Sequence, residues 1–211
     1  VRTMKVIDNF LPRSYHRELL ELMSGPDFPW HFNSNIVYQD QDSGSVYEHG
    51  FTHVFWDEFN GFRDANQYGN FWRPGLLSIM DVVSEEYHNS PILRSRAVMT
   101  TSAPILRSRA DMTTAAPILR SRAKLLTASP DNFTHTPHKD FEFDNIDTIY
   151  YVNDSDGDTI IYGPNGEIVD RASPKANRLI IFKGNQPHTG CSPNKTKCRI
   201  LINSNFETEK L

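Results

Sequence analysis

Two histidines and one aspartate in the second half of the chain have the residue types and the spacing of a metal site. His138 and Asp140 are two positions apart, and His188 follows after a long interval. On an extended backbone, side chains two residues apart point to the same face. A histidine from elsewhere can then complete one face of an octahedron, as in the 2-His-1-carboxylate facial triad, which leaves positions on Fe(II) open for other ligands. The sequence therefore predicts that these three residues bind a metal ion.

An arginine opens the last β-prone run of the chain, residues 197–205. Arg199 follows His188 after a short loop, and its guanidinium could bind a carboxylate through two parallel hydrogen bonds. Four features thus occur in order: His-x-Asp, a strand with Tyr150 and Tyr151, a lone histidine after a Gly/Pro turn, and this arginine. In this order they are much more specific than a His-x-Asp alone.

At these residues the chain resembles the 2-oxoglutarate- and Fe(II)-dependent oxygenases. It is similar, more closely, to the small prolyl-4-hydroxylase-like members found in phage and marine metagenomic sequences. The resemblance covers nearly the whole chain except a repeated insert, and the matching segments are residues 5–12, 28–30, 122–127, 138–140, 149–154, 177–182 and 199–203. It implies a mainly β fold with flanking helices, the double-stranded β-helix or jelly roll, with the metal at one open end.

The resemblance also implies a role for each site residue. His138, Asp140 and His188 would be the catalytic metal ligands for Fe(II), 2-oxoglutarate would chelate two further positions through its 2-oxo acid end, and O2 would take the last. Arg199 would pair with the distal carboxylate of 2-oxoglutarate. Tyr151 would donate its hydroxyl to the same carboxylate.

Four other positions also enter this comparison. Tyr150 would face away from the site, because strand side chains alternate. Thr127 and Asn203 are weaker candidates for a place beside the cosubstrate. Many relatives carry Asn where Lys124 stands, so the chemistry of the pocket would differ here if that position touches cosubstrate or substrate.

The implied activity is hydroxylation of a C–H bond by a dioxygenase, with release of succinate and CO2 and with ascorbate as an optional addition. The substrate stays open: peptidyl proline is the expectation by analogy, with a nucleobase or a free amino acid as alternatives. Two other interpretations also stay open. One is a non-catalytic, cupin-like metal-binding jelly-roll module, and the other is a protein that the duplicated insert leaves misfolded or inactive.

Length and composition limit the interpretation further. A chain of 211 residues is expected to form one domain, and its net charge of −4 does not indicate broad binding to nucleic acid or to an anionic membrane. No apolar run is long enough to span a bilayer, and the first residues have no leader signature. Two cysteines, Cys191 and Cys198, fit reduced thiols better than a disulfide framework. We therefore expect a cytoplasmic protein, in the host cytoplasm if the source is a phage.

The predicted single oxygenase domain has three parts: N-terminal helical and strand support over residues 1–90, a duplicated insert over 91–116, and a jelly-roll core over 117–211. A helix is expected from Leu11 to Gly25, a loop over 61–72, and a second helix over 74–88. The segment Pro-Ile-Leu-Arg-Ser-Arg-Ala begins at residues 91, 104 and 117. The third copy occupies the place of the strand that precedes His-x-Asp, so the first two are interpreted as a tandem duplication.

Several features have both a functional and a structural interpretation. The arginines of the three copies could form a patch for nucleic acid or an acidic partner, but solvated strand faces are the favoured interpretation. The aromatic stretches 28–38 and 49–56 could line a substrate wall, although core packing is favoured. Residues 153–158 look more like a turn than a calcium loop. His135 is not predicted as a ligand, and Glu142 is either near the site or on the surface.

Overall fold

The computed structural model describes residues 3–36, 45–87 and 118–208, which form eleven strands, two α-helices and one 3-10 turn. The helices are α1 (Arg13–Ser24) and α2 (Gln67–Tyr87), and the turn is η2 (Pro130–Asn132). The strands are β1 (Met4–Asp8), β2 (His31–Asn33), β3 (Gly50–Asp57), β4 (Phe62–Arg63), β5 (Ile118–Thr127), β6 (Asn145–Tyr151), β7 (Thr159–Tyr162), β8 (Ile168–Ala172), β9 (Arg178–Lys183), β10 (His188–Gly190) and β11 (Cys198–Glu207).

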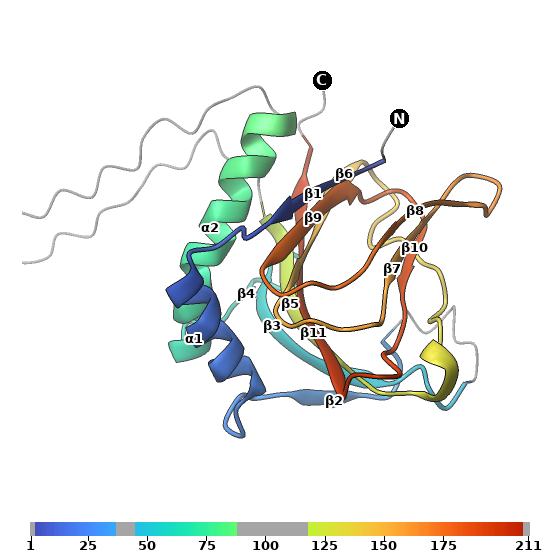
Figure 1. Cartoon of the computed structure of the whole chain (residues 1–211). Helices are drawn as coiled ribbons and strands as arrows, with labels where there is room; N and C mark the ends of the chain where they lie inside the picture. The colour runs from blue at the N-terminus through green and yellow to red at the C-terminus, as the bar shows by residue number, and fades with distance from the viewer. Residues whose placement is uncertain (1–2, 37–44, 88–117, 209–211) are drawn as a thin grey trace, which may run out of the picture.

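The strands form two antiparallel sheets. The larger has the order β1-β9-β6-β11-β5-β3-β2, with β4 beside β3, and the smaller has the order β10-β7-β8. In Figure 1 the two helices lie on one side of the larger sheet, and the smaller sheet lies on its other side. This is a jelly roll with flanking helices, so the predicted fold class is confirmed.

Each face of the larger sheet has its own hydrophobic core. On β6, Tyr150 belongs to the core against the helices, together with Trp72 of α2. The neighbouring Tyr151 belongs to the core between the sheets, together with Ile161 of β7. This arrangement follows from the alternation of side chains along a strand, and it confirms that Tyr150 faces away from the site.

The first helix agrees with the sequence prediction. α1 begins directly after Pro12, whose fixed φ suits a helix start, and it ends at Gly25. Leu19 and Met23 are fully buried on its apolar face.

The second helix begins seven residues earlier than predicted, so the expected loop over 61–72 is wrong in its second half. The side chain of Asn66 accepts the backbone N–H of Tyr68 at 2.8 Å, which caps the helix start. Pro74 then lies inside the helix. The Tyr15 hydroxyl donates to the Phe71 carbonyl at 2.6 Å and accepts from the Gly75 N–H at 3.3 Å, so α1 satisfies backbone groups next to the proline. These two hydrogen bonds let α2 continue through Pro74, although a proline inside a helix normally breaks the helix.

The third copy of the repeat is a strand, as predicted. It supplies β5, which lies between β11 and β3 in the larger sheet. The first two copies lie outside the described residues. In the part of the chain that the structure describes, neither helix has the length and apolar character needed to cross a membrane.

Candidate metal centre and cosubstrate pocket

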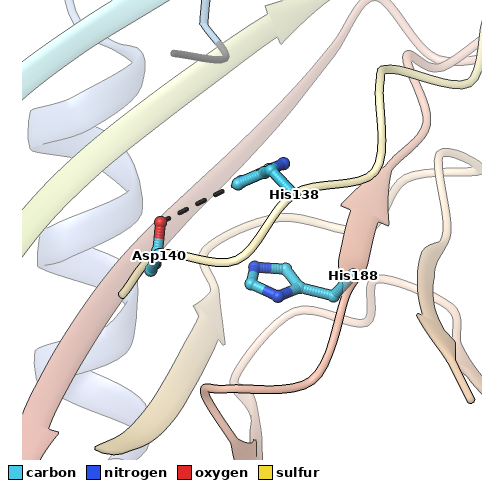
Figure 2. Close-up of side chains that lie close together, drawn as sticks. All are labelled: His138, Asp140 and His188. Atoms are coloured by element: carbon cyan, nitrogen blue, oxygen red, sulfur yellow. Dashed lines mark ion pairs between the residues drawn. The ribbon is translucent and has the colours of Figure 1, made fainter. Parts of the chain in front are cut away.

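The three predicted ligands come together at one end of the barrel. His138 and His188 face each other across an isolated antiparallel bridge, in which each backbone N–H donates to the other's carbonyl at 2.9 Å. Asp140 follows in a bend, and its Oδ1 is 3.9 Å from Nε2 of His138. One ligand atom from each residue lies within 4.8 Å of the other two (Figure 2).

Both imidazoles are held with one nitrogen directed toward the site. Nδ1 of His138 lies 3.2 Å from the carbonyl of Thr136, and Nδ1 of His188 lies 3.1 Å from the carbonyl of Gln186. A carbonyl can only accept, so Nδ1 carries the proton and Nε2 keeps its lone pair. Burial, with a contribution from His188, lowers the pKa of His138 to about 3, and burial also lowers the pKa of His188. Both rings are therefore neutral at pH 7, as metal ligands must be.

The carboxylate ligand lies among positive charges. Asp140 is 4% exposed, and its Oδ1 lies 3.0 Å from Arg120 and 3.8 Å from Arg122, both on β5. Asn205 donates to its other oxygen at 2.8 Å. Burial alone would raise the pKa of Asp140, but the charges of Arg120 and Lys124 outweigh it and hold that pKa well below its usual value. Asp140 is thus ionised and ready to bind a cation.

The same contacts correct the interpretation of the repeat arginines as solvated strand faces. In the third copy, Arg120 is 6% exposed and points into the barrel, where it faces Asp140 and lies over the ring of Phe141 at 4.8 Å. A buried carboxylate without a cation beside it would be strongly unfavourable, which explains why the arginine turns inward.

A second buried carboxylate lies beside the site. Asp147 accepts a hydrogen bond from the same Asn205 amide, and its Oδ2 is 3.9 Å from Nε2 of His188. Burial raises the pKa of Asp147 well above its usual value, and the charge of Asp140 adds to that effect. The surroundings therefore favour the neutral form of Asp147 and the ionised form of Asp140.

Arg199 lies in the same pocket as the two histidines, and it is 2% exposed. Its Nη2 donates to Oγ1 of Thr159 at 2.6 Å, and its Nη1 lies 3.5 Å from the carbonyl of Cys191. The Tyr151 hydroxyl lies 2.6 Å from the same Thr159 oxygen. No carboxylate among the described residues pairs with this guanidinium, and its Nε has no hydrogen-bond partner there.

The pocket between the metal ligands and Arg199 has apolar and polar walls. Ile149 and Leu201 are among its apolar residues, and Lys124 and Asn203 are among its polar ones. Thr127 pairs with Cys198, which is the cross-strand pair next to Leu126–Arg199. Because side chains alternate along a strand, Thr127 lies on the face of β5 that points away from the pocket.

Glu48, which no sequence pattern indicated, supports the metal centre from the loop before β3. It is 1% exposed, and its Oε1 accepts from the backbone N–H of Thr136 at 2.9 Å and from the Thr136 hydroxyl at 2.7 Å. Thr136 in turn provides the carbonyl that orients His138. The other oxygen of Glu48 lies 3.0 Å from Nδ1 of His135, whose Nε2 lies 2.9 Å from the Ser192 hydroxyl.

Other residues singled out in the sequence have structural surroundings. Both ring nitrogens of His135 are engaged as just described, so it is available only as a support. Glu142 is on the surface, paired with Lys139 at 3.0 Å. The aromatic residues Phe28 and Phe55 pack with His53 beneath the helices, which agrees with core packing. Both cysteines are free thiols.

The donor set fits Fe(II). Two neutral imidazole nitrogens from residues that line the pocket, and one carboxylate oxygen within 4.8 Å of them, are the ligands of the facial triad. The buried guanidinium at the other side of the pocket fits the second carboxylate of a dicarboxylic acid.

Comparison with known proteins gives matches in structure only. No protein-family model and no curated protein sequence matches the chain. A prolyl hydroxylase from Trichoplax adhaerens, solved with a peptide fragment of the oxygen degradation domain of hypoxia inducible factor, superposes with a TM-score of 0.61 at 14% identity, over 99% of this chain and 84% of that one. A prolyl-4-hydroxylase from Pseudomonas putida gives 0.57 at 10% identity, over 99% and 94%.

A third match is an oxidoreductase of the 2OG-Fe(II) oxygenase family from Burkholderia pseudomallei, with a TM-score of 0.64 at 7% identity, over 98% of this chain and 86% of that one. The likeness extends over the whole described fold in all three cases. Together with the sheet order, it shows that this chain has the fold of the 2-oxoglutarate- and Fe(II)-dependent oxygenases.

Proposed function

We propose that the protein is an Fe(II)- and 2-oxoglutarate-dependent dioxygenase that hydroxylates a C–H bond. One observation carries the proposal: a buried arginine without a carboxylate partner among the described residues lies in the same pocket as two neutral histidines, and an ionised aspartate lies within 4.8 Å of those histidines. A metal-binding module would have no need for a buried, uncompensated guanidinium, which is unfavourable until an anion binds. A dicarboxylate that also reaches the metal satisfies both groups.

Each residue has a defined task in this proposal. His138, Asp140 and His188 hold Fe(II), which when bound supplies the redox chemistry that converts 2-oxoglutarate, O2 and a C–H bond into succinate, CO2 and a C–OH bond. Arg199 binds the distal carboxylate. Tyr151 adds a hydroxyl near that carboxylate.

The surroundings of the pocket support these tasks. Thr159 accepts from Arg199 and so fixes the direction of its guanidinium. Ile149 and Leu201 exclude water from the walls, which strengthens each charge interaction inside. Burial and the charge of Asp140 raise the pKa of Asp147, which disfavours a second negative charge that would compete for the metal or repel an anionic cosubstrate.

The test is turnover of 2-oxoglutarate to succinate by the whole protein, supplied with Fe(II), O2 and ascorbate. We expect turnover by the wild type, none by Asp140→Ala, and wild-type turnover by Glu142→Ala, which removes an exposed carboxylate two positions away. Binding of metal and 2-oxoglutarate without any succinate would favour the non-catalytic module. Equal turnover by the wild type and Asp140→Ala would refute the proposed metal centre.

For the prime substrate we propose a C–H bond of peptidyl proline. Support comes from the two prolyl hydroxylases among the structural matches, one of them solved with a peptide. The experiment is incubation of the loaded enzyme with proline-containing peptides, nucleosides and free amino acids, followed by mass spectrometry for a gain of one oxygen atom. Oxygen gained only by nucleosides or free amino acids would replace peptidyl proline by that class.

A further inference from the structure

Three cationic side chains of β5 point into the barrel. Arg120, Arg122 and Lys124 are two positions apart, and they pair with Asn205, Asn203 and Leu201 of β11. Since Leu201 belongs to the core between the sheets, this face of β5 is the inner one. A single strand thus delivers three positive charges to the interior.

These three cations differ in what they face. Arg120 and Arg122 lie within 3.8 Å of Asp140. Lys124 lines the pocket with His138 and Arg199, and its ammonium makes no hydrogen bond or ion pair with a described residue. Of these three cations, it is the one that no acidic side chain in the described part of the chain binds.

The position of Lys124 along the strand places it between the two ends of the pocket. Toward one end of β5, the cross-strand pair of Arg120 and Asn205 contacts Asp140; toward the other end, Leu126 is paired with Arg199. Lys124 lies between these two cross-strand pairs. The pocket that Lys124 lines is also lined by both metal-binding histidines, so the ammonium shares this space with the metal end.

The charge balance of the pocket calls for an anion. Among the described residues, Asp140 is the acidic side chain that pairs with cations of β5, through Arg120 and Arg122, and neither Lys124 nor Arg199 has an acidic partner there. Burial, with a smaller contribution from Arg122, lowers the pKa of Lys124 to about 8, so the side chain is mostly protonated at pH 7 and is charged in a poorly solvated place. A bound carboxylate would relieve that penalty.

We propose that Lys124 is a second cationic contact for the cosubstrate, and that it binds the carboxylate of the 2-oxo acid end while Arg199 binds the carboxylate of the other end. This inference rests on the proposed function. It makes the pocket selective for an acid with two carboxylates, one matched to each cation.

The test is the dissociation constant of 2-oxoglutarate for the Co(II)-loaded protein, measured by calorimetry, so that it does not depend on turnover. A charged hydrogen bond contributes about 1.5–3 kcal/mol, so Lys124→Met should weaken binding by about tenfold to 150-fold. Lys124→Arg, which keeps the charge, should stay within a few fold of the wild type. Lys139→Met removes a lysine next to His138 that pairs with Glu142 on the surface, and it should leave binding unchanged.

A monocarboxylate probe assigns the end of the cosubstrate. 2-Oxobutyrate keeps the 2-oxo acid group and lacks the second carboxylate. Lys124→Met should weaken its binding by the same factor as for 2-oxoglutarate, whereas Arg199→Met should weaken only 2-oxoglutarate. An effect of Lys124→Met on 2-oxoglutarate alone would overturn the placement at the 2-oxo acid end.

The remaining outcomes separate the inference from the function on which it rests. Wild-type affinity for 2-oxoglutarate in Lys124→Met, with turnover intact in the wild type, would refute the role of Lys124 and leave the oxygenase proposal standing. No binding of 2-oxoglutarate by the metal-loaded wild type would overturn both. If Lys124→Met does not fold, Lys124→Gln gives the same comparison with a polar, neutral side chain.

Discussion

Replacement of Arg199 by methionine should have opposite effects on the free protein and on the protein with cosubstrate. The guanidinium is 2% exposed and lacks a carboxylate partner among the described residues. Replacing even a buried ion pair by apolar side chains of similar volume is often neutral or stabilises by about 1–4 kcal/mol, and an unpaired buried charge has less to offset its desolvation. We therefore expect Arg199→Met without ligand to unfold at the same temperature as the wild type or a higher one, although it loses the hydrogen bond to Thr159.

With cosubstrate present, the effect of Arg199→Met on stability should have the opposite sign. Loss of one partner of a buried charge pair weakens binding by about 2–5 kcal/mol, which is at least about thirtyfold in the dissociation constant. At a concentration one hundred times the wild-type dissociation constant, 2-oxoglutarate should stabilise the wild type by about 2.7 kcal/mol. The same concentration is at most about three times the dissociation constant of the variant, so Arg199→Met should gain about 0.9 kcal/mol or less.

Thermal unfolding of the Co(II)-loaded proteins with and without 2-oxoglutarate measures both effects. For a chain of this size, the wild-type shift should be about 5–11 °C and that of Arg199→Met no more than about 4 °C. The matched control is Arg178→Met, which removes an arginine paired with Asp8 on the surface and should keep the full ligand shift. A variant of Arg199 that is much less stable without ligand, yet keeps the wild-type shift, would show that this arginine has a structural role instead.

Three further substitutions test other parts of the site. Glu48→Gln should weaken Co(II) binding about tenfold to hundredfold, because it loosens Thr136, whose carbonyl orients a metal-binding imidazole; unchanged Co(II) affinity in a titration would exclude that support. Gly190→Ala should weaken 2-oxoglutarate more than metal, because a Cβ there would collide with Nη1 of Arg199; calorimetry with each ligand separates the two, and equal losses would contradict the reasoning. Asp156→Asn should lower the melting temperature at pH 7, because this carboxylate accepts three backbone N–H groups of residues 194–196. These hydrogen bonds outweigh burial and lower the pKa of Asp156, so its contribution is present above pH 3.8 and fades below it; a difference that persists at lower pH would argue against this assignment.

Local periodicity was enough to predict much of the fold. The adjacent residues Tyr150 and Tyr151 enter different cores because β6 is a regular strand, and its alternation can be read from the sequence. The start of α2 could not be read in the same way. It depends on a cap by Asn66 and on the Tyr15 hydroxyl, which reaches a carbonyl far along the chain.

The predicted site residues lie close together, but their backbone conformation differs from the one expected from the sequence. His138 and Asp140 were expected on one extended strand, whereas the structure has an isolated bridge at His138 and a bend at Asp140. The spacing therefore identified residues that lie together, but it did not predict the conformation of their backbone. Glu48 and Asp147 gave no signal, because a single carboxylate in a loop or a strand gains its meaning only from neighbours distant in sequence.

The residue that follows each copy of the repeated segment determines which side chain that copy could place in the pocket. The three copies share Pro-Ile-Leu-Arg-Ser-Arg-Ala, but the next residue is Val98 in the first, Asp111 in the second and Lys124 in the third. In β5 this is the residue that points into the pocket between the metal ligands and Arg199. A shift of one copy would preserve both arginines and the alternation of the strand, yet it would replace the pocket cation by an aspartate. If the pocket binds a dianion, only the third copy has the charge that the site requires, so copies that are equivalent for the sheet are not equivalent for the chemistry.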